Sequence, residues 1–277
     1  MARKTKSSRR PITLITGASA GIGEALAHVF AREGHDLVLV ARRGGKLKAL
    51  AASIEKAGRG KPVILPLDLA KPGAADRIAK VLATKNLEAQ FVVNNAGFGL
   101  FGRAGELSRD KQLAMIDLNV RSLTDLSLFF IDSIAKHRGG ILNAASIVSF
   151  LPGPGMAMYY ATKHFVLSLT ESLHQELKPR GIRVTALCPG PVRTEFQKEA
   201  GLSDDALPSV LTVSAQDVAE QAYRGLMAGK ARVIPGVLNK LLTQVYRIMP
   251  RSLFARITDV SQNRRMARHG GRPAKGS

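Results

Sequence analysis

Tyr159 and Lys163 are four residues apart, and Ser146 lies thirteen residues before the tyrosine. Side chains four residues apart share one face of a helix, so the lysine cation can lie beside the phenol. A phenol has an ordinary pKa of about 10, and a neighbouring cation lowers it by favouring the phenolate. A serine hydroxyl can hold a carbonyl or alcohol oxygen against the phenol. The three residues predict proton transfer at Tyr159, although the Tyr-x-x-x-Lys spacing by itself also arises by chance.

A glycine-rich segment, Thr-Gly-Ala-Ser-Ala-Gly-Ile-Gly over residues 16–23, stands near the start of the chain. Gly17, Gly21 and Gly23 fall between an expected strand at 12–16 and an expected helix at 22–33. Glycines let the backbone approach a pyrophosphate, and a helix N-terminus supplies amide donors and a favourable dipole. Glycine also serves ordinary tight turns. The position between strand and helix nevertheless predicts a dinucleotide cradle.

The second expected strand ends at Ala41 and is followed by Arg42 and Arg43. Enzymes that prefer NAD usually carry an acid at this strand end, which binds the ribose 2′-hydroxyl. The guanidinium fork of Arg42 can instead pair with a 2′-phosphate. The alternative is that both arginines belong to a solvated loop. The missing acid favours NADP(H) over NAD(H).

Polar residues follow two further strands and interrupt one helix. Asp68 follows the third expected strand, and Asn94-Asn95-Ala96-Gly97 follows the fourth. The carboxyl ends of parallel strands are where an adenosine would lie, although Asn-Ala-Gly is also a turn signal. Asn119 lies in an otherwise apolar helix, where its amide needs a partner. By itself it fits a satisfied core asparagine.

The order of elements predicts an α/β fold with a Rossmann-type, doubly wound parallel sheet of about seven strands in a single domain over residues 11–235. Short apolar runs alternate with helical patterns, as expected for a parallel sheet covered on both faces. The expected strands are 12–16, 36–41, 62–67, 90–94, 140–146, 182–188 and 231–234. The expected helices are 22–33, 45–57, 72–85, 108–136, 156–178 and 215–228. Residues 191–213 have no sustained period and predict a mobile substrate lid or an ordinary surface loop.

The cysteine and histidine content limits the possible chemistry. The single cysteine, Cys188, excludes an internal disulfide, and its place in an expected strand indicates an inert core thiol. The six histidines show no metal-ligand spacing, so we expect no metal site.

The formal net charge of +20 resides mostly at the two ends of the chain. Residues 1–10 contain five basic residues and no acid, which indicates a disordered basic arm. Residues 230–277 contain eleven basic residues against Asp259 alone. The nearly balanced centre argues against specific nucleic-acid binding. The apolar run after Arg9-Arg10 is too short for an export signal, and no run of 18 apolar residues occurs, so we expect a cytoplasmic protein.

The segment 236–277 is a basic amphipathic extension. Apolar residues recur at helical spacing before and after Pro250. Such a helix can lie on an anionic membrane surface, pack over the protein's own substrate cleft or pack against another subunit. An apolar substrate fits the first two arrangements.

Taken together, these motifs resemble the short-chain dehydrogenase/reductase family. The matches occur in order over residues 11–235 and end with Pro189-Gly-Pro-Val-Arg-Thr194. The resemblance implies that Tyr159 is the proton donor or acceptor, that Ser146 positions the substrate oxygen, that Lys163 binds the nicotinamide ribose and that Asn119 holds a relay water. The cofactor-binding residues that it implies are Gly17, Ser19, Gly21, Ile22, Gly23, Arg42, Asp68, Leu69, Asn95, Ala96, Gly97, Tyr159, Lys163, Pro189, Gly190, Val192 and Thr194.

The resemblance implies a nicotinamide-dependent oxidoreductase that interconverts a carbonyl and a secondary alcohol. The expectation of NADP(H) rests on Arg42 and the missing acid alone. We expect a homodimer or homotetramer. One departure concerns Ala20, where NADP-preferring members often carry a basic residue. Two other classes stay open: a catalytically idle NADP-binding regulator, and a protein that binds membranes or polyanions through its basic ends.

Overall fold

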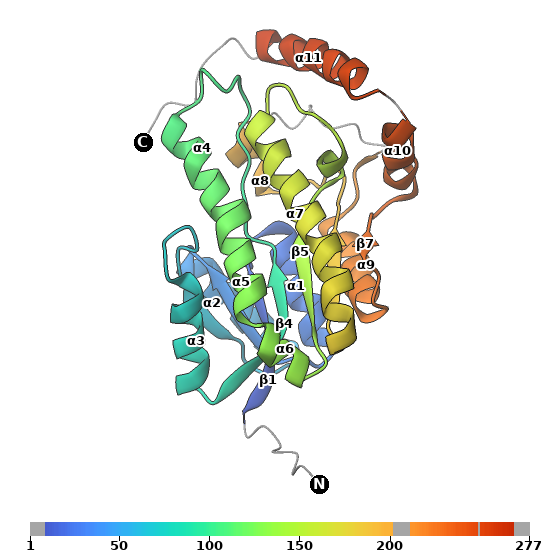
Figure 1. Ribbon diagram of the computed structural model, residues 1–277. Coiled ribbons are helices and arrows are strands. Elements are labelled where there is room, and N and C mark those ends of the chain that lie inside the picture. The colour runs from blue at the N-terminus through green and yellow to red at the C-terminus, as the bar shows by residue number, and fades with distance from the viewer. Residues whose placement is uncertain (1–8, 202–210, 249, 269–277) are drawn as a thin grey trace.

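The sheet lies at the centre of the protein and contains seven parallel strands (Figure 1). The computed structural model describes residues 9–201, 211–248 and 250–268. The strand order is β3-β2-β1-β4-β5-β6-β7, which confirms the predicted fold class. The strands are β1 Arg10–Thr16, β2 Leu37–Ala41, β3 Val63–Pro66, β4 Leu87–Asn94, β5 Gly140–Ala144, β6 Arg183–Leu187 and β7 Arg232–Val233. Arg10, which the sequence analysis placed in the basic arm, begins β1.

The strand order creates a crevice at the carboxyl edge of the sheet. From β1 the chain winds outward through β2 to β3, and it then returns to pair β4 with the other side of β1. Crossovers on opposite sides of such a point leave the loops apart, which is where doubly wound sheets bind ligands. The residues after β1, β4, β5 and β6 therefore border one crevice.

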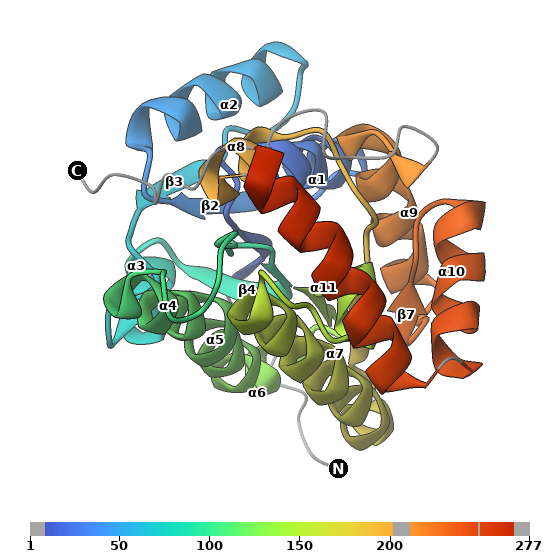
Figure 2. The same cartoon turned by 90° about the horizontal axis from the view of Figure 1, so that it is seen from above.

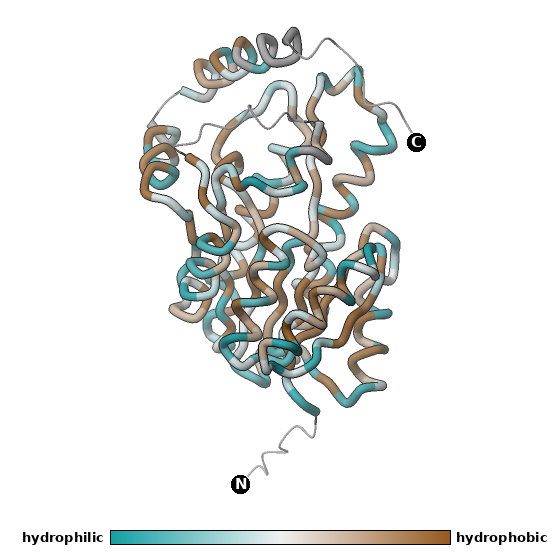
Figure 3. The backbone as a smooth tube through the Cα atoms, turned by 180° about the vertical axis from the view of Figure 1, so that it is seen from behind, coloured by the Kyte–Doolittle hydropathy of each residue, from teal (hydrophilic) through white to brown (hydrophobic). Residues whose placement is uncertain are grey.

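Helices cover both faces of the sheet, and each face has its own apolar core. On one face α1 (Gly21–Arg32), α2 (Gly44–Lys56) and α9 (Ala215–Met227) contribute to one cluster. On the other face α3 (Ala74–Thr84) and the helices between β4 and β6 contribute to the second. Figure 3 shows hydrophobic residues concentrated in the sheet and in the helices against it. Burial on both sides explains the nearly continuous apolar strands.

The prediction of one helix over 108–136 is wrong. The segment divides into α4 (Arg109–Ile116), a π-helical stretch (Asp117–Ser122), α5 (Leu123–Phe129) and α6 (Ile131–Lys136). The predicted cap is present, because Ser108 Oγ accepts a hydrogen bond from the Lys111 amide at 3.4 Å. The π-helical stretch adds a residue to the turn, and such bulges often occur at functional sites. Periodicity alone does not reveal it, because α4 continues into α5 as one ribbon in Figure 1.

The helix α7 (Ala157–Leu177) ends at its predicted stop signal, since Gly181 follows a short 3₁₀ turn with φ of 72°. The loop after β6 differs from expectation, because residues 191–201 include α8 (Glu195–Ala200). Gln197 holds the start of α8: its Oε1 accepts a hydrogen bond from the Thr194 amide at 3.0 Å. The rest of the expected lid, 202–210, lies outside the described residues.

Two C-terminal helices, α10 (Val237–Ile248) and α11 (Arg251–Arg268), follow β7. Figure 2 shows α11 lying across the carboxyl edge of the sheet. The buried Asn239 anchors α10, because its Nδ2 donates to Pro235 O at 2.8 Å and to Leu211 O at 3.2 Å. Across the described ranges, none of the helices has the length and apolar character needed to cross a membrane.

Candidate active site

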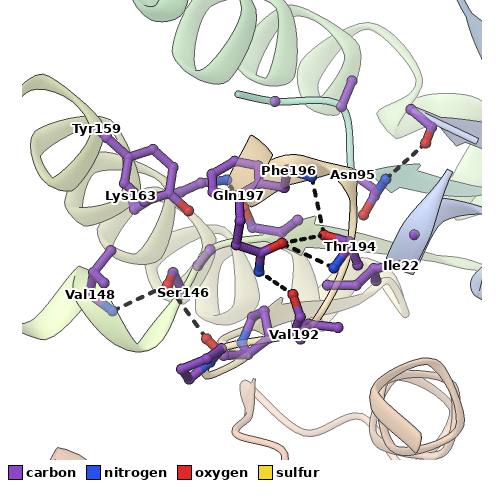
Figure 4. Close-up of a pocket in the computed structure, with 18 of the residues that line it drawn as sticks. Ile22, Asn95, Ser146, Val148, Tyr159, Lys163, Val192, Thr194, Phe196 and Gln197 are labelled. Atoms are coloured by element: carbon purple, nitrogen blue, oxygen red, sulfur yellow. Dashed lines mark hydrogen bonds between the residues drawn. The ribbon is translucent and has the colours of Figure 1, made fainter. Parts of the chain in front are cut away.

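Ser146, Tyr159 and Lys163 meet at the carboxyl edge of the sheet (Figure 4). Ser146 follows β5 and caps the 3₁₀ turn Ile147–Phe150, and the other two lie one turn apart on α7. All three side chains are at least nine-tenths buried. Lys163 Nζ lies 5.8 Å from the centre of the Tyr159 ring. The predicted group is therefore assembled beside a cavity of about 620 Å³.

The Ser146 hydroxyl is fixed by the backbone on both sides. It accepts a hydrogen bond from the Val148 amide at 3.3 Å and donates to Pro189 O at 3.4 Å. Ser149 Oγ accepts from the Ser146 amide and completes a capping box. The hydroxyl also lies near the Tyr159 phenol and acts to lower the pKa of that group. A small side chain with this many partners has a defined position next to the phenol.

Burial dominates the electrostatics of Tyr159 and Lys163. It raises the pKa of the Tyr159 phenol above its ordinary value, and the Ser146 hydroxyl acts in the opposite direction. Burial also lowers the pKa of Lys163 to about 8. The expected lowering of the phenol pKa by Lys163 is not met here, because burial outweighs every stabilisation of the phenolate. Lys163 Nζ instead donates to Ala144 O at 2.6 Å.

Asn119 lies in the π-helical stretch and satisfies its amide within the protein. Its Oδ1 accepts from the Phe98 amide at 3.1 Å, and its Nδ2 donates to Phe98 O at 2.9 Å and Thr162 Oγ1 at 3.1 Å. A Cβ at Gly97 would lie 2.9 Å from Asn119 Oδ1 and 3.6 Å from Lys163 Nζ. Asn119 therefore holds the loop after β4 against α7, close to the lysine.

The glycine turn after β1 has room for backbone but not for side chains. Gly17 and Gly21 have φ of 65° and 59°, in the left-handed region that favours glycine. A Cβ at Gly17 would lie 2.8 Å from Ala96 Cα, and one at Gly21 would lie 2.9 Å from Thr194 Cγ2. A groove that a single Cβ would fill, at a helix N-terminus, fits the pyrophosphate of a dinucleotide.

Most of the residues that the sequence analysis proposed line this one cavity. The exceptions are Gly23, which packs under the turn with no room for a Cβ beside Gly17 O, and Asn119. The proposed residues that line the cavity are Gly17, Ser19, Gly21, Ile22, Arg42, Asp68, Leu69, Asn95, Ala96, Gly97, Ser146, Tyr159, Lys163, Pro189, Gly190, Val192 and Thr194. Asn95 also holds the cradle, because its Nδ2 donates to Thr16 O at 3.2 Å.

Sequence reasoning missed the apolar wall opposite the cradle. Phe196 of α8, Tyr246 of α10, and Phe254 and Ile257 of α11 line the cavity together with Met156. The rings of Phe196 and Tyr159 are 5.4 Å apart, and those of Tyr246 and Phe254 are 5.0 Å apart. Aromatic residues in the C-terminal amphipathic pattern were the available signal. The structure packs the C-terminal segment over the cavity, one of the three predicted arrangements.

Sequence reasoning also did not predict the contact between Arg43, Lys46 and Glu195 beside the cradle. Arg43 Nη1 lies 2.6 Å from Glu195 Oε2, and Lys46 Nζ binds the other carboxylate oxygen. Arg43 further donates through Nε and Nη2 to Ser19 Oγ at 3.2 and 3.0 Å. The two cations and Glu195 are about 150 residues apart in the chain, so no local pattern could reveal the contact.

The sheet topology and the cradle place this protein among the Rossmann-type dinucleotide-binding oxidoreductases. The family model described as short chain dehydrogenase matches residues 11–205, well over half of the chain. The chain therefore belongs to the short-chain dehydrogenase family, and a nicotinamide cofactor follows from that membership.

Known relatives carry out different reactions on this fold. A sulfoacetaldehyde reductase from Chromohalobacter salexigens is 33% identical over 217 residues, which cover 76% of this chain and 85% of that protein. A short-chain dehydrogenase from Sphingobium yanoikuyae in complex with NADPH is 32% identical, with a TM-score of 0.75 over 96% of this chain and 98% of its own. A bulky-bulky ketone specific alcohol dehydrogenase from Comamonas testosteroni is 28% identical, with a TM-score of 0.71 over 97% and 98%. Both structural overlaps extend into the C-terminal helices.

Proposed function

We propose that the protein is an NADP(H)-dependent oxidoreductase that interconverts an apolar ketone or aldehyde and the corresponding alcohol. The observation that carries the proposal is the convergence of Ser146, Tyr159 and Lys163 on a cavity that has the glycine cradle at one end and an apolar wall at the other. Binding and proton transfer can therefore occur in one cavity. The nicotinamide supplies or accepts the hydride when it is bound.

The protein's own residues would position the substrate oxygen and move one proton. The Ser146 and Tyr159 hydroxyls would both hydrogen-bond that oxygen and stabilise the charge that develops on it. Burial keeps Tyr159 protonated at neutral pH, which suits donation of the phenol proton to the oxygen in the reducing direction. In the oxidising direction Tyr159 would have to start as the phenolate, which would take the proton of the alcohol and become the phenol again. Lys163 would hold positive charge next to this transfer.

The preference for NADP(H) is proposed from the end of β2. Ala41 stands where an NAD-preferring enzyme usually has an acid, and Arg42 and Arg43 follow it at the cavity edge. Arginine forks match the oxygens of a phosphate. The complex of the Sphingobium yanoikuyae relative with NADPH is consistent with this preference.

An apolar substrate is proposed from the apolar side chains that line the cavity with Tyr159. Met156, Phe196, Phe254 and Ile257 present carbon to this space, and α11 covers it. Burying an apolar substrate against such a wall is favourable by about 25 cal/mol for each Å² removed from water. The bulky-ketone specificity of the Comamonas testosteroni relative supports the same size class.

The proposal is tested by NADPH oxidation across ketones and aldehydes of increasing apolar size, with acyl-thioesters as a comparison. We expect kcat/KM to rise with apolar size and NADPH to be used in preference to NADH. Equal rates with charged and apolar carbonyls would contradict the substrate class. An absence of turnover with every carbonyl, despite tight NADPH binding, would favour an idle NADP-binding regulator.

A further inference from the structure

An ion cluster joins the two sides of the cradle entrance. Glu195 is the first residue of α8, whereas Arg43 and Lys46 lie between the end of β2 and the first turn of α2. Arg43 simultaneously donates to Ser19 Oγ in the turn after β1. All of these residues except Lys46 line the cavity. The contact therefore connects the start of α8, after β6, with the loop after β2 and with the glycine turn after β1.

The cations of this cluster lie next to Arg42, at the strand end where a 2′-phosphate would be bound. In Rossmann folds the ribose lies at the end of the second strand, and a nearby arginine accommodates the 2′-phosphate of NADP. Here Arg42 and Arg43 follow the strand at the cavity edge, and Lys46 lies in the first turn of α2. Arg43 also binds the hydroxyl of Ser19 in the glycine turn. Among the described residues, the Glu195 carboxylate is an anion that Arg43 and Lys46 both bind. A carboxylate and a phosphate use the same guanidinium geometry, so both cannot take the same donors of Arg43.

We propose that Glu195 is a specificity-determining residue that competes with the cofactor 2′-phosphate for Arg43 and Lys46. The proposal rests on the NADP(H) preference put forward above. Binding of NADP(H) would displace the carboxylate from Arg43, whereas NAD(H) has no 2′-phosphate to do so. The segment after β6 would therefore respond differently to the two cofactors.

The charges in the cluster are consistent with replacement of the Glu195 carboxylate by the 2′-phosphate on Arg43 and Lys46. Lys46 and then Arg43 hold the Glu195 pKa at about 2, so the carboxylate is ionised across the physiological range. Its side chain is 47% exposed, and exposed ion pairs are individually weak and screened by salt. A phosphate carries more charge than a carboxylate and can therefore replace it on these donors.

Displacing the Glu195 carboxylate would also affect the part of the cavity that contains Tyr159. The next residue, Phe196, has its ring 5.4 Å from that of Tyr159. A Cβ at Gly99 would lie 3.0 Å from the Phe196 ring, so the phenylalanine is held closely on that side. Releasing Glu195 would loosen the same helical turn that forms this wall.

The experiment compares two fragments that differ only in the 2′-phosphate, adenosine 2′,5′-bisphosphate and 5′-AMP, by isothermal titration calorimetry of the full chain. For Glu195→Gln we expect the bisphosphate to bind roughly three- to tenfold more tightly and 5′-AMP to be unchanged. The matched control is Glu220→Gln, which removes an exposed carboxylate paired with Arg32 at 2.5 Å away from the cavity and should change neither affinity. Unchanged or weaker binding of the bisphosphate to Glu195→Gln overturns the proposal.

A second background distinguishes competition for donors from simple repulsion. In Arg43→Ala the tightening caused by Glu195→Gln should shrink, because one shared donor is gone. The same tightening in both backgrounds would mean that Glu195 acts only through its field, which overturns competition for Arg43. The wild-type ratio of the two fragments tests the NADP(H) preference separately: a ratio near one contradicts that proposed function, whatever Glu195→Gln does to it.

Discussion

At the scale of single residues, the candidate site combines two buried groups whose charged forms are both disfavoured. Burial raises the pKa of Tyr159 and lowers the pKa of Lys163 to about 8. A phenol that stays protonated is a ready proton donor, and a lysine that titrates near 8 is poised to change charge. The protein therefore places a neutral acid beside a cation that is costly to bury.

Tyr159→Phe removes the phenol oxygen and keeps the ring. We expect turnover to fall by at least about a hundredfold, because general acid–base catalysis contributes roughly 10²- to 10⁴-fold. NADPH binding, measured by titration, should stay within a fewfold of wild type, since the cradle is unchanged. Normal turnover in this variant would remove Tyr159 from the mechanism.

The lowered pKa of Lys163 predicts how the stability of the protein without cofactor depends on pH. Between about pH 8 and pH 10.5 the unfolded chain keeps the lysine proton while the folded chain loses it. The unfolded state binds more protons, so this group makes the free energy of unfolding rise with pH through that window. At about 1.36 kcal/mol per unit, the rise is about 2 to 3 kcal/mol.

Lys163→Met has no proton to lose and is the reference for this effect. Denaturant unfolding of both proteins from pH 7.5 to 10.5 should show the wild type gaining on the variant as pH increases. Groups common to both proteins, including the Tyr159 phenol and Cys188, largely cancel in the difference. A constant difference across the window would mean that the lysine pKa is not lowered.

At the scale of elements, the strands were predictable because each is an apolar run buried on both sides. Val38 and Val40 of β2 face one core and Leu37 and Leu39 face the other, so the sequence is apolar at every position. The glycine cradle was equally predictable, because its geometry depends on backbone within a few residues. The Cys188 prediction also holds: burial in the core raises its pKa to about 12.

What escaped prediction depends on contacts between distant segments. The π-helical stretch around Asn119 follows from its bonds to Phe98, twenty-one residues away. The ion pairs of Glu195 are made with cations about 150 residues earlier in the chain. The C-terminal helices were recognised as amphipathic, but only the packed structure shows that Tyr246 and Phe254 face the cavity.

The helix α11 provides a prediction about substrate size. Phe254 lines the cavity and packs against Tyr246, whereas its neighbour Leu253 is 49% exposed and does not line it. For Phe254→Ala we expect KM for a bulky apolar ketone to rise roughly 5- to 20-fold, with a smaller effect on a short ketone, since about 1 to 2 kcal/mol of apolar contact is lost. Leu253→Ala is the matched control and should leave both values unchanged. Steady-state kinetics with both ketones measures the difference, and equal effects of the two substitutions would contradict the assigned wall.

At the scale of the whole molecule, the large apolar side chains that are exposed among the described residues include two groups on different helices. One surface lies on α10 and α11, where Leu241 and Val260 are 59% and 52% exposed. The other lies on α4, α5 and α7, which run side by side in Figures 1 and 2. There Leu128 is 50% exposed and Phe165 is 42% exposed. Exposed apolar patches of this kind commonly mark protein interfaces.

We expect the second surface, on α5 and α7, to form the interface of a homo-oligomer. In a two-fold interface each residue is used twice, so Leu128→Asp and Phe165→Asp together would bury four carboxylates in apolar contact. The dissociation constant should rise at least about a hundredfold, equivalent to about 3 kcal/mol, and light scattering after size exclusion would show smaller particles. Leu241→Asp with Val245→Asp places the same charges on exposed positions of α10 and serves as the control. If only the α10 variant dissociates, the interface lies on the surface of α10 and α11 instead.

The net charge of +20 makes two subunits repel each other, which opposes assembly. Moderate salt screens this repulsion and should therefore strengthen the oligomer.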